Sequence, residues 1–453
     1  MRPPYSKSKF VRRSRVFRVS LGVWKPRIVF WTGAFAIGVT SVAFAKIADI
    51  AQKSFALLTT SGHWSFLIPL ALTPLGFAIS AWLAITRFPN SQGSGIPQAI
   101  AARHLRDDQG RLRLLSLRVA FGKIALTVLG LFCGASIGRE GPTVQVGAAF
   151  MYAAARFSGM AQARGLILAG SAAGIAGAFN TPLAGIVFAI EEMGRTYESR
   201  ANGIVLTAVI LSGLAALGLS GSYNYFGTAQ ASPVDLVDWT LVPVCGLGGG
   251  ILGAVFSGLV LHFTTRIRRW AQPRPVRRMV LLAGLFGLAV AVIGILSSGA
   301  TFGTSYEEAR GAVEGHPTSL LFFAGKLVAT LLCMLSGIPG GIFAPSLAVG
   351  AGFGSTVGTL LGANIALAAI LGMAGYFAGV VQAPMTAFVI IVEMTGDHRA
   401  VIPIMAVSMI GYVVSRVLSP EPLYHGLSRN FIAAAIRAKR ATEKVGVDQV
   451  AHS

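Results

Sequence analysis

The sequence predicts an all-α integral membrane protein built from two matching halves. The prediction depends on its composition, its long apolar runs and an internal repeat. The chain has 453 residues, of which 54% are hydrophobic and 12% are charged, and its mean hydropathy is +0.67. Soluble globular proteins contain about 25% charged residues, so this composition excludes a soluble enzyme, a disordered chain and a fibrous protein. The strict alternation that marks an outer-membrane barrel is also absent.

Apolar runs recur along most of the chain, and a helix needs roughly 18 or more such residues to cross a bilayer. The clearest are residues 28–44, 66–85, 241–261, 280–296 and 401–417. Gly is frequent, with 55 residues, and it clusters with Pro in short motifs inside apolar stretches. This pattern predicts broken helices, which are typical of transporters and channels.

The net charge of +21 is distributed so that it indicates membrane orientation rather than nucleic-acid binding. Residues 1–27 carry many Lys and Arg but no acid, and residues 103–118 and 266–278 are also basic. In contrast, residues 220–240 lack Lys and Arg, and residues 301–318 contain three glutamates. By the positive-inside rule, the basic segments and both termini are cytoplasmic and the other two loops face outward. A cleaved secretory signal is a weaker interpretation, because the first apolar stretch has the length of a span.

Two stretches of the chain match at a nearly constant offset, as in transporters built from repeats. Residues 123–138 align with residues 326–341 at an offset of 203, and residues 182–191 align with residues 384–393 at 202. A chance likeness between two Gly-rich helices would not keep Lys, Pro and Glu in matching positions. The repeat predicts two equivalent halves, although loop charges alone do not decide whether they are parallel or inverted.

Three Gly-Pro motifs stand immediately before apolar runs: GSGIP at residues 93–97, GREGP at 138–142 and GIFAP at 341–345. Pro is favoured in the first turn of a helix and Gly allows close approach, so each motif predicts a helix N-terminus inside the membrane. Such an end attracts an anion through free N–H groups and the helix dipole. Three of them together would form an anion pathway, whereas any single motif could be a surface loop-to-helix junction.

Glu140, inside the second motif, supports the anion pathway. A carboxylate at a helix N-terminus competes with an anion for the same position, and acids within membrane segments are functional by default. In the alternative interpretation, the neighbouring Arg139 simply neutralises Glu140 as an ion pair.

Together and in this order, the three motifs resemble the signature sequences of the CLC chloride channel and transporter family. The resemblance covers roughly residues 28–440 and includes residues 178–185, 191–193, 392–395 and 422–424. It implies a CLC-type fold of about eighteen helical segments, many tilted or incomplete, in two inverted halves. It also implies a homodimer with one pathway in each subunit.

The resemblance implies a set of chloride-binding residues. Ser94 matches the residue whose hydroxyl holds the central anion, and Tyr424 matches the residue that closes the site from the cytoplasmic side. Nitrate-preferring members have Pro at the position of Ser94, so Ser94 favours chloride. The other members of the predicted set are Gly95, Gly141, Ile342 and Phe343.

Two acids match residues for gating and proton transfer. Glu140 matches the external gating glutamate, which blocks the path when ionised and swings out when protonated. Glu192 matches an internal proton relay that exchangers carry and most channels lack, so it favours proton/chloride antiport. Alternatively, Glu191 and Glu192 form a solvated pair near Arg195, and the protein is a passive, voltage- or pH-gated chloride channel. Glu393, which matches Glu191 in the second repeat, is predicted to be structural.

The sequence contains no enzymatic or metal-binding motif. The seven histidines lack metal-ligand spacing, and His104 and His425 are interpreted as solvated residues on the cytoplasmic side. The three cysteines form no CxxC pair and are interpreted as core residues. An intramembrane hydrolase using Glu140 and Ser136 is a remote alternative, because that pair lacks a third orienting group. We therefore expect no enzyme, no catalytic residues, no metal and no cofactor apart from bound chloride.

The predicted organisation is a cytoplasmic tail (1–27), a first membrane half (28–219), an external linker (220–240), a second half (241–440) and a cytoplasmic tail (441–453). About 29 residues follow Tyr424, so we expect no nucleotide-sensing module, and this minimal form resembles prokaryotic members of a bacterial inner membrane. The expected partners are chloride, protons, membrane lipid and a second copy of the chain, without nucleic acid. The resemblance implies a dimer surface near residues 182–193, 204–219, 384–394 and 402–417.

Overall fold

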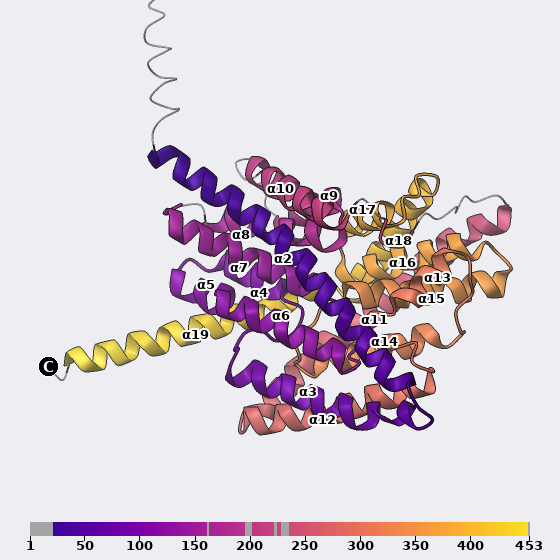
Figure 1. Cartoon of the computed structure of the whole chain (residues 1–453), viewed down its shortest axis with the longest axis horizontal. Helices are drawn as coiled ribbons and strands as arrows, with labels where there is room; N and C mark the ends of the chain where they lie inside the picture. The colour runs from indigo at the N-terminus through magenta and orange to yellow at the C-terminus, as the bar shows by residue number, and fades with distance from the viewer. Residues whose placement is uncertain (1–20, 161–162, 195–201, 222–223, 228–234, 452–453) are drawn as a thin grey trace, which may run out of the picture.

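The regular elements of the computed structural model are all helices over the part of the chain that it describes, residues 21–160, 163–194, 202–221, 224–227 and 235–451 (Figure 1). The first half contains α2 (Leu21–Thr60), η1 (Ser65–Leu67), α3 (Pro69–Thr86), α4 (Ile96–His104), α5 (Asp108–Leu115), α6 (Leu117–Phe132), α7 (Glu140–Ser158), α8 (Ala163–Phe179), α9 (Pro182–Phe188), η2 (Ala189–Gly194) and α10 (Asn202–Ser220). The second half contains α11 (Leu236–Ala271), α12 (Pro275–Leu296), α13 (Tyr306–Val313), α14 (Phe322–Leu335), α15 (Phe343–Leu361), α16 (Ile365–Val381), α17 (Pro384–Thr395), α18 (Val401–Leu418) and α19 (Leu423–Ala451).

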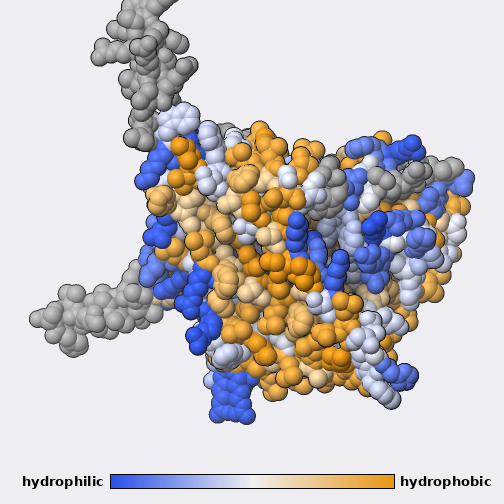
Figure 2. Space-filling model, in the orientation of Figure 1, coloured by the Kyte–Doolittle hydropathy of each residue, from blue (hydrophilic) through white to orange (hydrophobic). Residues whose placement is uncertain are grey.

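Eight helical stretches in the described residues are long and apolar enough to cross a membrane. The five apolar runs predicted as spans lie in α2, α3, α11, α12 and α18, so their helical prediction is confirmed. Apolar side chains cover most of the visible face, and hydrophilic ones gather toward its left and right edges (Figure 2). Such a surface is suited to hydrocarbon rather than water.

The two halves pack their equivalent helices through equivalent glycines. A Cβ atom on Gly147 of α7 would lie 2.2 Å from the carbonyl oxygen of Gly170 on α8. In the second half, a Cβ atom on Gly350 of α15 would lie 2.7 Å from the carbonyl oxygen of Gly372 on α16. Small residues of this kind let membrane helices approach to backbone contact. The repeat seen in the sequence is therefore a repeat of helix packing.

The basic segment 103–118 is partly helical and partly buried. Residues 103–118 include the whole of α5, and both Arg103 and Arg111 are 8% exposed. Arg111 donates to the carbonyl oxygen of Leu105 through Nε at 3.1 Å and Nη2 at 2.8 Å. Both side chains donate to backbone carbonyl oxygens, and Arg111 Nη1 also lies 3.4 Å from Asp108 Oδ1, contacts that a count of charges along the sequence does not reveal.

The segments between the halves and at the chain ends are described only in part. α10 ends at Ser220 and α11 begins at Leu236, so the predicted linker, residues 220–240, overlaps the first turn of α11. The predicted outward loop, residues 301–318, contains the helix α13. The basic residues before position 21 and Arg195 lie outside the described residues. α19 extends away from the helical body (Figure 1).

Candidate anion and proton site

The three Gly-Pro motifs are far apart in the sequence but meet through backbone hydrogen bonds. The N–H groups of Gly138 and Gly341 each donate to the other's carbonyl oxygen at 2.7 Å. Gly93 donates to the carbonyl of Ile338 at 3.1 Å, and Gly340 donates to the carbonyl of Gly93 at 3.1 Å. Because Gly138 and Gly341 are equivalent in the two repeats, their exchange is the pattern that a twofold relation produces.

Each motif begins a helix, as predicted. α4 begins at Ile96 after Gly95, whose φ of 101° lies in the left-handed region that favours glycine. α7 begins at Glu140 and α15 begins at Phe343, and a Pro lies in the first turn of each. The first turns of all three helices are buried. Their free N–H groups therefore point into the protein, where an anion can use them.

Glycine allows these helix ends to converge on Ser94. A Cβ atom on Gly141 would lie 2.4 Å from Ser94 Oγ, and one on Gly95 would lie 2.9 Å from the carbonyl oxygen of Gly141. A Cβ atom on Gly341 would lie 2.9 Å from the amide nitrogen of Gly141. The structure thus brings together the predicted residues of all three motifs, including Ile342, which immediately precedes α15.

The hydroxyl groups of Ser94 and Tyr424 are buried without a hydrogen-bond partner. Ser94 is 1% exposed and Tyr424 is 0% exposed, and neither oxygen makes a hydrogen bond of normal distance and angle with a described residue. The Tyr424 hydroxyl lies near that of Ser94 and within electrostatic range of Glu140 and Glu192. A buried, unpaired donor costs free energy, and a bound anion would supply the missing acceptor for both hydroxyls.

Aromatic rings surround the start of α15. The Phe343 ring centroid lies 4.9 Å from that of Phe377, 6.0 Å from Phe188 and 6.1 Å from Tyr424. These contacts fix the Phe343 side chain, so its backbone N–H is held in place at the helix end. The Tyr424 ring is positioned by the same cluster.

Glu140 is the first residue of α7 and is 0% exposed. Its Oε2 lies only 2.3 Å from where a Cβ atom on Gly138 would stand, and its carboxylate lies beside the backbone of Ala344 in the first turn of α15. The carboxylate is therefore next to the starts of two helices. That is a position in which a free anion would also be stabilised.

Arg139 forms no ion pair with Glu140, contrary to the alternative interpretation of the sequence. Its Nη1 forms an ion pair with Asp49 of α2 and donates to the carbonyl of Ala45 at 2.8 Å. No Arg139–Glu140 ion pair within 4 Å is found in the described residues. The guanidinium is thus held by α2, away from a direct contact that would neutralise Glu140.

Two buried lysines hold equivalent loops in the two halves. Lys123 Nζ donates to the carbonyl of Gly93 at 2.8 Å, and Lys326 Nζ donates to the carbonyls of Gly303 at 2.7 Å and Thr301 at 3.1 Å. Sequence reasoning noted these lysines in the repeat but gave them no role. Lys123 fixes the loop that carries Ser94, so it positions the candidate anion site.

Glu191 in the first half caps a helix of the second half, and Glu393 in the second half caps a helix of the first. Glu191 accepts hydrogen bonds from the N–H groups of Met385 at 3.0 Å and Thr386 at 2.6 Å at the start of α17. Glu393 accepts from the N–H groups of Leu183 at 3.1 Å and Ala184 at 2.7 Å at the start of α9. Both acids thus make structural contacts, in agreement with the expectation for Glu393.

Glu192 is buried and not part of a solvated pair, so the interpretation of Glu191 and Glu192 as a solvated pair is wrong. Its side chain is 1% exposed, and His425 Nε2 lies 3.8 Å from its Oε1. Arg103 donates to the carbonyls of Met193 and Gly194, which follow Glu192 in η2. Neither His425 nor Arg103 could be placed here from the sequence, because the contacts join residues 233 and 90 positions apart.

The hydrolase alternative lacks its required contact. Ser136 Oγ lies 2.9 Å from Thr330 Oγ1, and the Ser136 N–H donates to Cys333 Sγ at 3.2 Å. Neither contact involves Glu140. The three cysteines are buried and unpaired, as expected for core residues.

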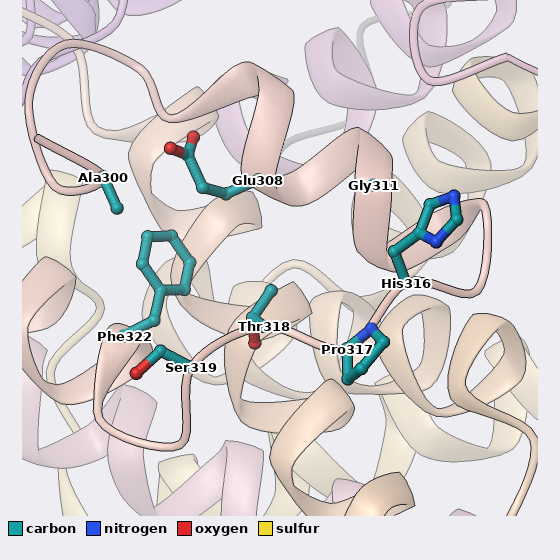
Figure 3. Close-up of a pocket in the computed structure, with 8 residues that line it drawn as sticks. All are labelled: Ala300, Glu308, Gly311, His316, Pro317, Thr318, Ser319 and Phe322. Carbon is teal, nitrogen blue, oxygen red and sulfur yellow. The ribbon is translucent and has the colours of Figure 1, made fainter. Parts of the chain in front are cut away.

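A separate pocket of about 300 Å³ lies in the second half, beside α13. Glu308 and Phe322 lie toward one end of it, and His316 and Pro317 toward the other (Figure 3). None of the motif residues lines this pocket, so it is distinct from the anion site. The remaining lining residues are Ala300, Gly311, Thr318 and Ser319.

Comparison with known proteins identifies the family. The model of the voltage gated chloride channel family, Voltage_CLC, matches residues 76–416, which include all three motifs. The chain belongs to the CLC family. Membership makes it an ion-transport protein of the membrane rather than an enzyme, and the resemblance seen in the motifs is confirmed.

Curated CLC relatives and solved CLC structures cover nearly the whole chain. The H(+)/Cl(-) exchange transporters ClcA of Salmonella typhi and Salmonella agona are each 31% identical over 439 residues, which cover 91% of this chain and 89% of theirs. A slow cyanobacterial Cl-/H+ antiporter has a TM-score of 0.77 at 25% identity and covers 90% of this chain and 98% of its own. A CLC-type fluoride/proton antiporter has a TM-score of 0.69 at 24% identity and covers 88% and 97%. The CLC fold is therefore confirmed, with eighteen α-helices in the described residues.

Proposed function

We propose that this CLC protein is a proton-coupled chloride antiporter. The observation that carries the proposal is the burial of two carboxylates, Glu140 and Glu192, within electrostatic range of the Tyr424 hydroxyl. An anion path alone needs no second buried acid, and burying one is costly. The exchange activity named for the ClcA relatives supports the same conclusion.

The anion is held by dipoles rather than by a full cationic side chain. Ser94 and Tyr424 provide hydroxyl donors, and the starts of α4, α7 and α15 provide backbone N–H groups and positive helix ends. Partial charges of this kind bind an anion firmly enough to admit it and weakly enough to release it. The resemblance of Ser94 to the chloride-binding position supports chloride as the transported anion.

Glu140 couples the anion to the proton by competing for its position. The ionised carboxylate lies beside the starts of α7 and α15, where it excludes an anion. Protonation removes its charge, so the side chain leaves and an anion enters. Glu192 supplies the proton from the opposite end of the path, and a bound anion lowers the cost of bringing a proton between the two acids.

The surroundings of the path complete the proposal. Both termini are cytoplasmic, the halves 28–219 and 241–440 enclose the path, and the protein resides in a bacterial inner membrane.

A homodimer forms on the exposed apolar side of α9, α10, α17 and α18, which removes that surface from lipid. Exposed apolar side chains there include those of Leu183, Leu206, Leu214, Met385, Ile402, Met409, Val413 and Val417.

The test is simultaneous measurement of chloride efflux and external pH in liposomes that contain the purified protein. We expect a chloride gradient to drive protons uphill in the wild type. We expect Glu192→Gln to keep chloride movement and lose proton movement. Glu307→Gln is the matched control, because it removes an exposed glutamate of α13 and should leave both fluxes unchanged.

Two other outcomes would replace the proposal. Chloride movement without any proton signal in the wild type would make the protein a passive channel, which is the second function this scaffold supports. Replacing chloride by fluoride tests the anion, since a fluoride/proton antiporter shares the fold. Coupled fluoride movement without chloride movement would overturn chloride as the substrate while leaving antiport intact.

A further inference from the structure

His425 lies against Glu192, although 233 positions separate them. Its Nε2 lies 3.1 Å from the Glu192 carbonyl oxygen and 3.8 Å from the carboxylate Oε1. Because a carbonyl oxygen can only accept, Nε2 is the protonated nitrogen and donates this hydrogen bond. The N–H edge of the imidazole is therefore held beside the Glu192 carboxylate.

The two side chains differ in their access to water. The Glu192 side chain is 1% exposed, whereas the His425 side chain is 19% exposed. A carboxylate enclosed in this way needs a neighbouring group to exchange protons with the solution. His425 contacts both environments, because its Nε2 lies near Glu192 and part of its side chain is exposed.

The start of α19 places His425 and Tyr424 on different sides. Tyr424 packs against Phe343 in the aromatic cluster of the anion site, while the next residue contacts Glu192. Ser428 Oγ donates to the His425 carbonyl at 2.8 Å and stabilises this first turn. One helical turn therefore serves the anion site and the proton entrance together.

Most of the charged side chains on the elements that pack near this pair are basic, and α16 carries no acidic or basic residue. Arg103 on α4 holds the end of η2 through the carbonyls of Met193 and Gly194. Other titratable or charged side chains lie on the elements that pack near His425. They are His104 on α4, Glu191 on η2, Glu421 and Arg429 around the start of α19, and four residues toward the C-terminal end of α11: His262, Arg266, Arg268 and Arg269.

We propose that His425 relays protons between the cytoplasmic solution and Glu192, a role that rests on the proposed antiport. A hydronium ion gives a proton to Nδ1, and Nε2 then releases its proton to the Glu192 carboxylate after a small side-chain rotation. The hydronium O–H bond and the Nε2–H bond break, the Nδ1–H bond and the carboxyl O–H bond form, and water is released, so atoms and charge balance. Exchange with water returns the ring to its starting tautomer. Histidine suits this step because it changes charge between about pH 5 and pH 8.

His425→Gln tests the relay, because the Gln amide can keep the hydrogen bond to the Glu192 carbonyl but cannot accept and release a proton. In the liposome assay we expect proton movement about tenfold slower than in the wild type, with chloride movement retained. We also expect the dependence of proton movement on internal pH near neutrality to disappear. His104→Gln is the matched control, because His104 is exposed and its Nδ1 lies 2.8 Å from the carbonyl oxygen of Ile100, one turn earlier in the same helix.

A second variant separates chemistry from structure. In His425→Ala, imidazole added to the interior buffer should restore proton movement, which a purely structural defect would not allow. Wild-type rates and an unchanged pH profile in His425→Gln would overturn the relay while leaving antiport intact. Absence of proton movement in the wild type would instead contradict the proposed antiport itself.

Discussion

The two halves of the molecule share a scaffold but differ in chemistry. Glu140 and Phe343 occupy equivalent positions as the first residues of α7 and α15, yet only the first half places an acid there. The backbone exchange between Gly138 and Gly341 is symmetric, so the scaffold itself does not distinguish the halves. Repetition supplies the geometry of converging helix ends, and a few unmatched side chains supply the function.

The loops before α4 and α13 show the same contrast. Lys123 and Lys326 hold the carbonyls of Gly93 and Gly303, so Ser94 and Thr304 follow equivalent anchored residues. Thr304 donates to Gln52 Oε1 through its N–H at 2.8 Å and its hydroxyl at 3.1 Å. The Ser94 hydroxyl has no such partner. One loop is thus satisfied by the protein, whereas the other presents a donor to a ligand.

Removing Glu140, the acid that the second half lacks at the equivalent position, should have the largest effect on transport. In Glu140→Gln we expect proton movement to fall about hundredfold, because the amide cannot carry a proton at this point of the path. Chloride movement should continue and lose its dependence on external pH, since the amide has no charge that competes with the anion. Paired chloride and pH recordings in liposomes measure both quantities.

Glu307→Gln is again the control, because Glu307 is exposed and remote from the motifs. Normal proton coupling in Glu140→Gln would show that the difference between α7 and α15 has no functional meaning. The comparison of the two halves would then reduce to one of packing.

The difference between the loops before α4 and α13 predicts that two Ala substitutions affect different properties: one weakens chloride binding and the other lowers stability. Both effects should be of intermediate size. Ser94→Ala removes a donor that only a ligand can use, so chloride binding should weaken about tenfold while thermal stability in detergent is unchanged or improved. Thr304→Ala removes a donor to Gln52, so it should lower the free energy of unfolding by about 1 kcal/mol and leave chloride binding unchanged. Titration calorimetry with chloride and thermal unfolding measure the two effects. Equal losses of chloride binding in both variants would contradict the contrast.

Sequence reasoning predicted the features that depend on local chemistry. Gly and Pro spacing located the starts of α4, α7 and α15, and the offset of 203 matched α7 with α15. These features were accessible because turns and helix starts are encoded by neighbouring residues.

Features that depend on distant contacts were missed. The pairing of Gln52 with Thr304 spans 252 positions, and that of His425 with Glu192 spans 233. The partner of Arg139 proved to be Asp49 on another helix, and the buried state of Arg103 was hidden by its place in a basic stretch. Such partners are selected by tertiary packing, which a single sequence does not show.

The smallest predicted effect is a loss of stability on removing the helix caps formed by Glu191 and Glu393, which the two halves share most closely. Glu191 and Glu393 each accept two N–H hydrogen bonds at the start of a helix in the other half. Replacing either by Gln leaves one acceptor oxygen and removes a charge that interacts favourably with the helix dipole. Each variant should therefore lose about 1 kcal/mol of stability, with transport retained.

The two losses of stability can be compared with each other and with that of the double variant. Glu191 has an additional bond from Thr386 Oγ1 at 2.8 Å, so Glu191→Gln should be slightly the more costly in thermal unfolding. Glu421→Gln is the control, since Glu421 pairs with Arg429 at an exposed site and should contribute little. The two acids share no partner, so the double variant should lose the sum of the single losses. A double loss much larger than that sum would mean that the two caps hold one interface between the halves together, and that the symmetry of the scaffold is itself a source of stability.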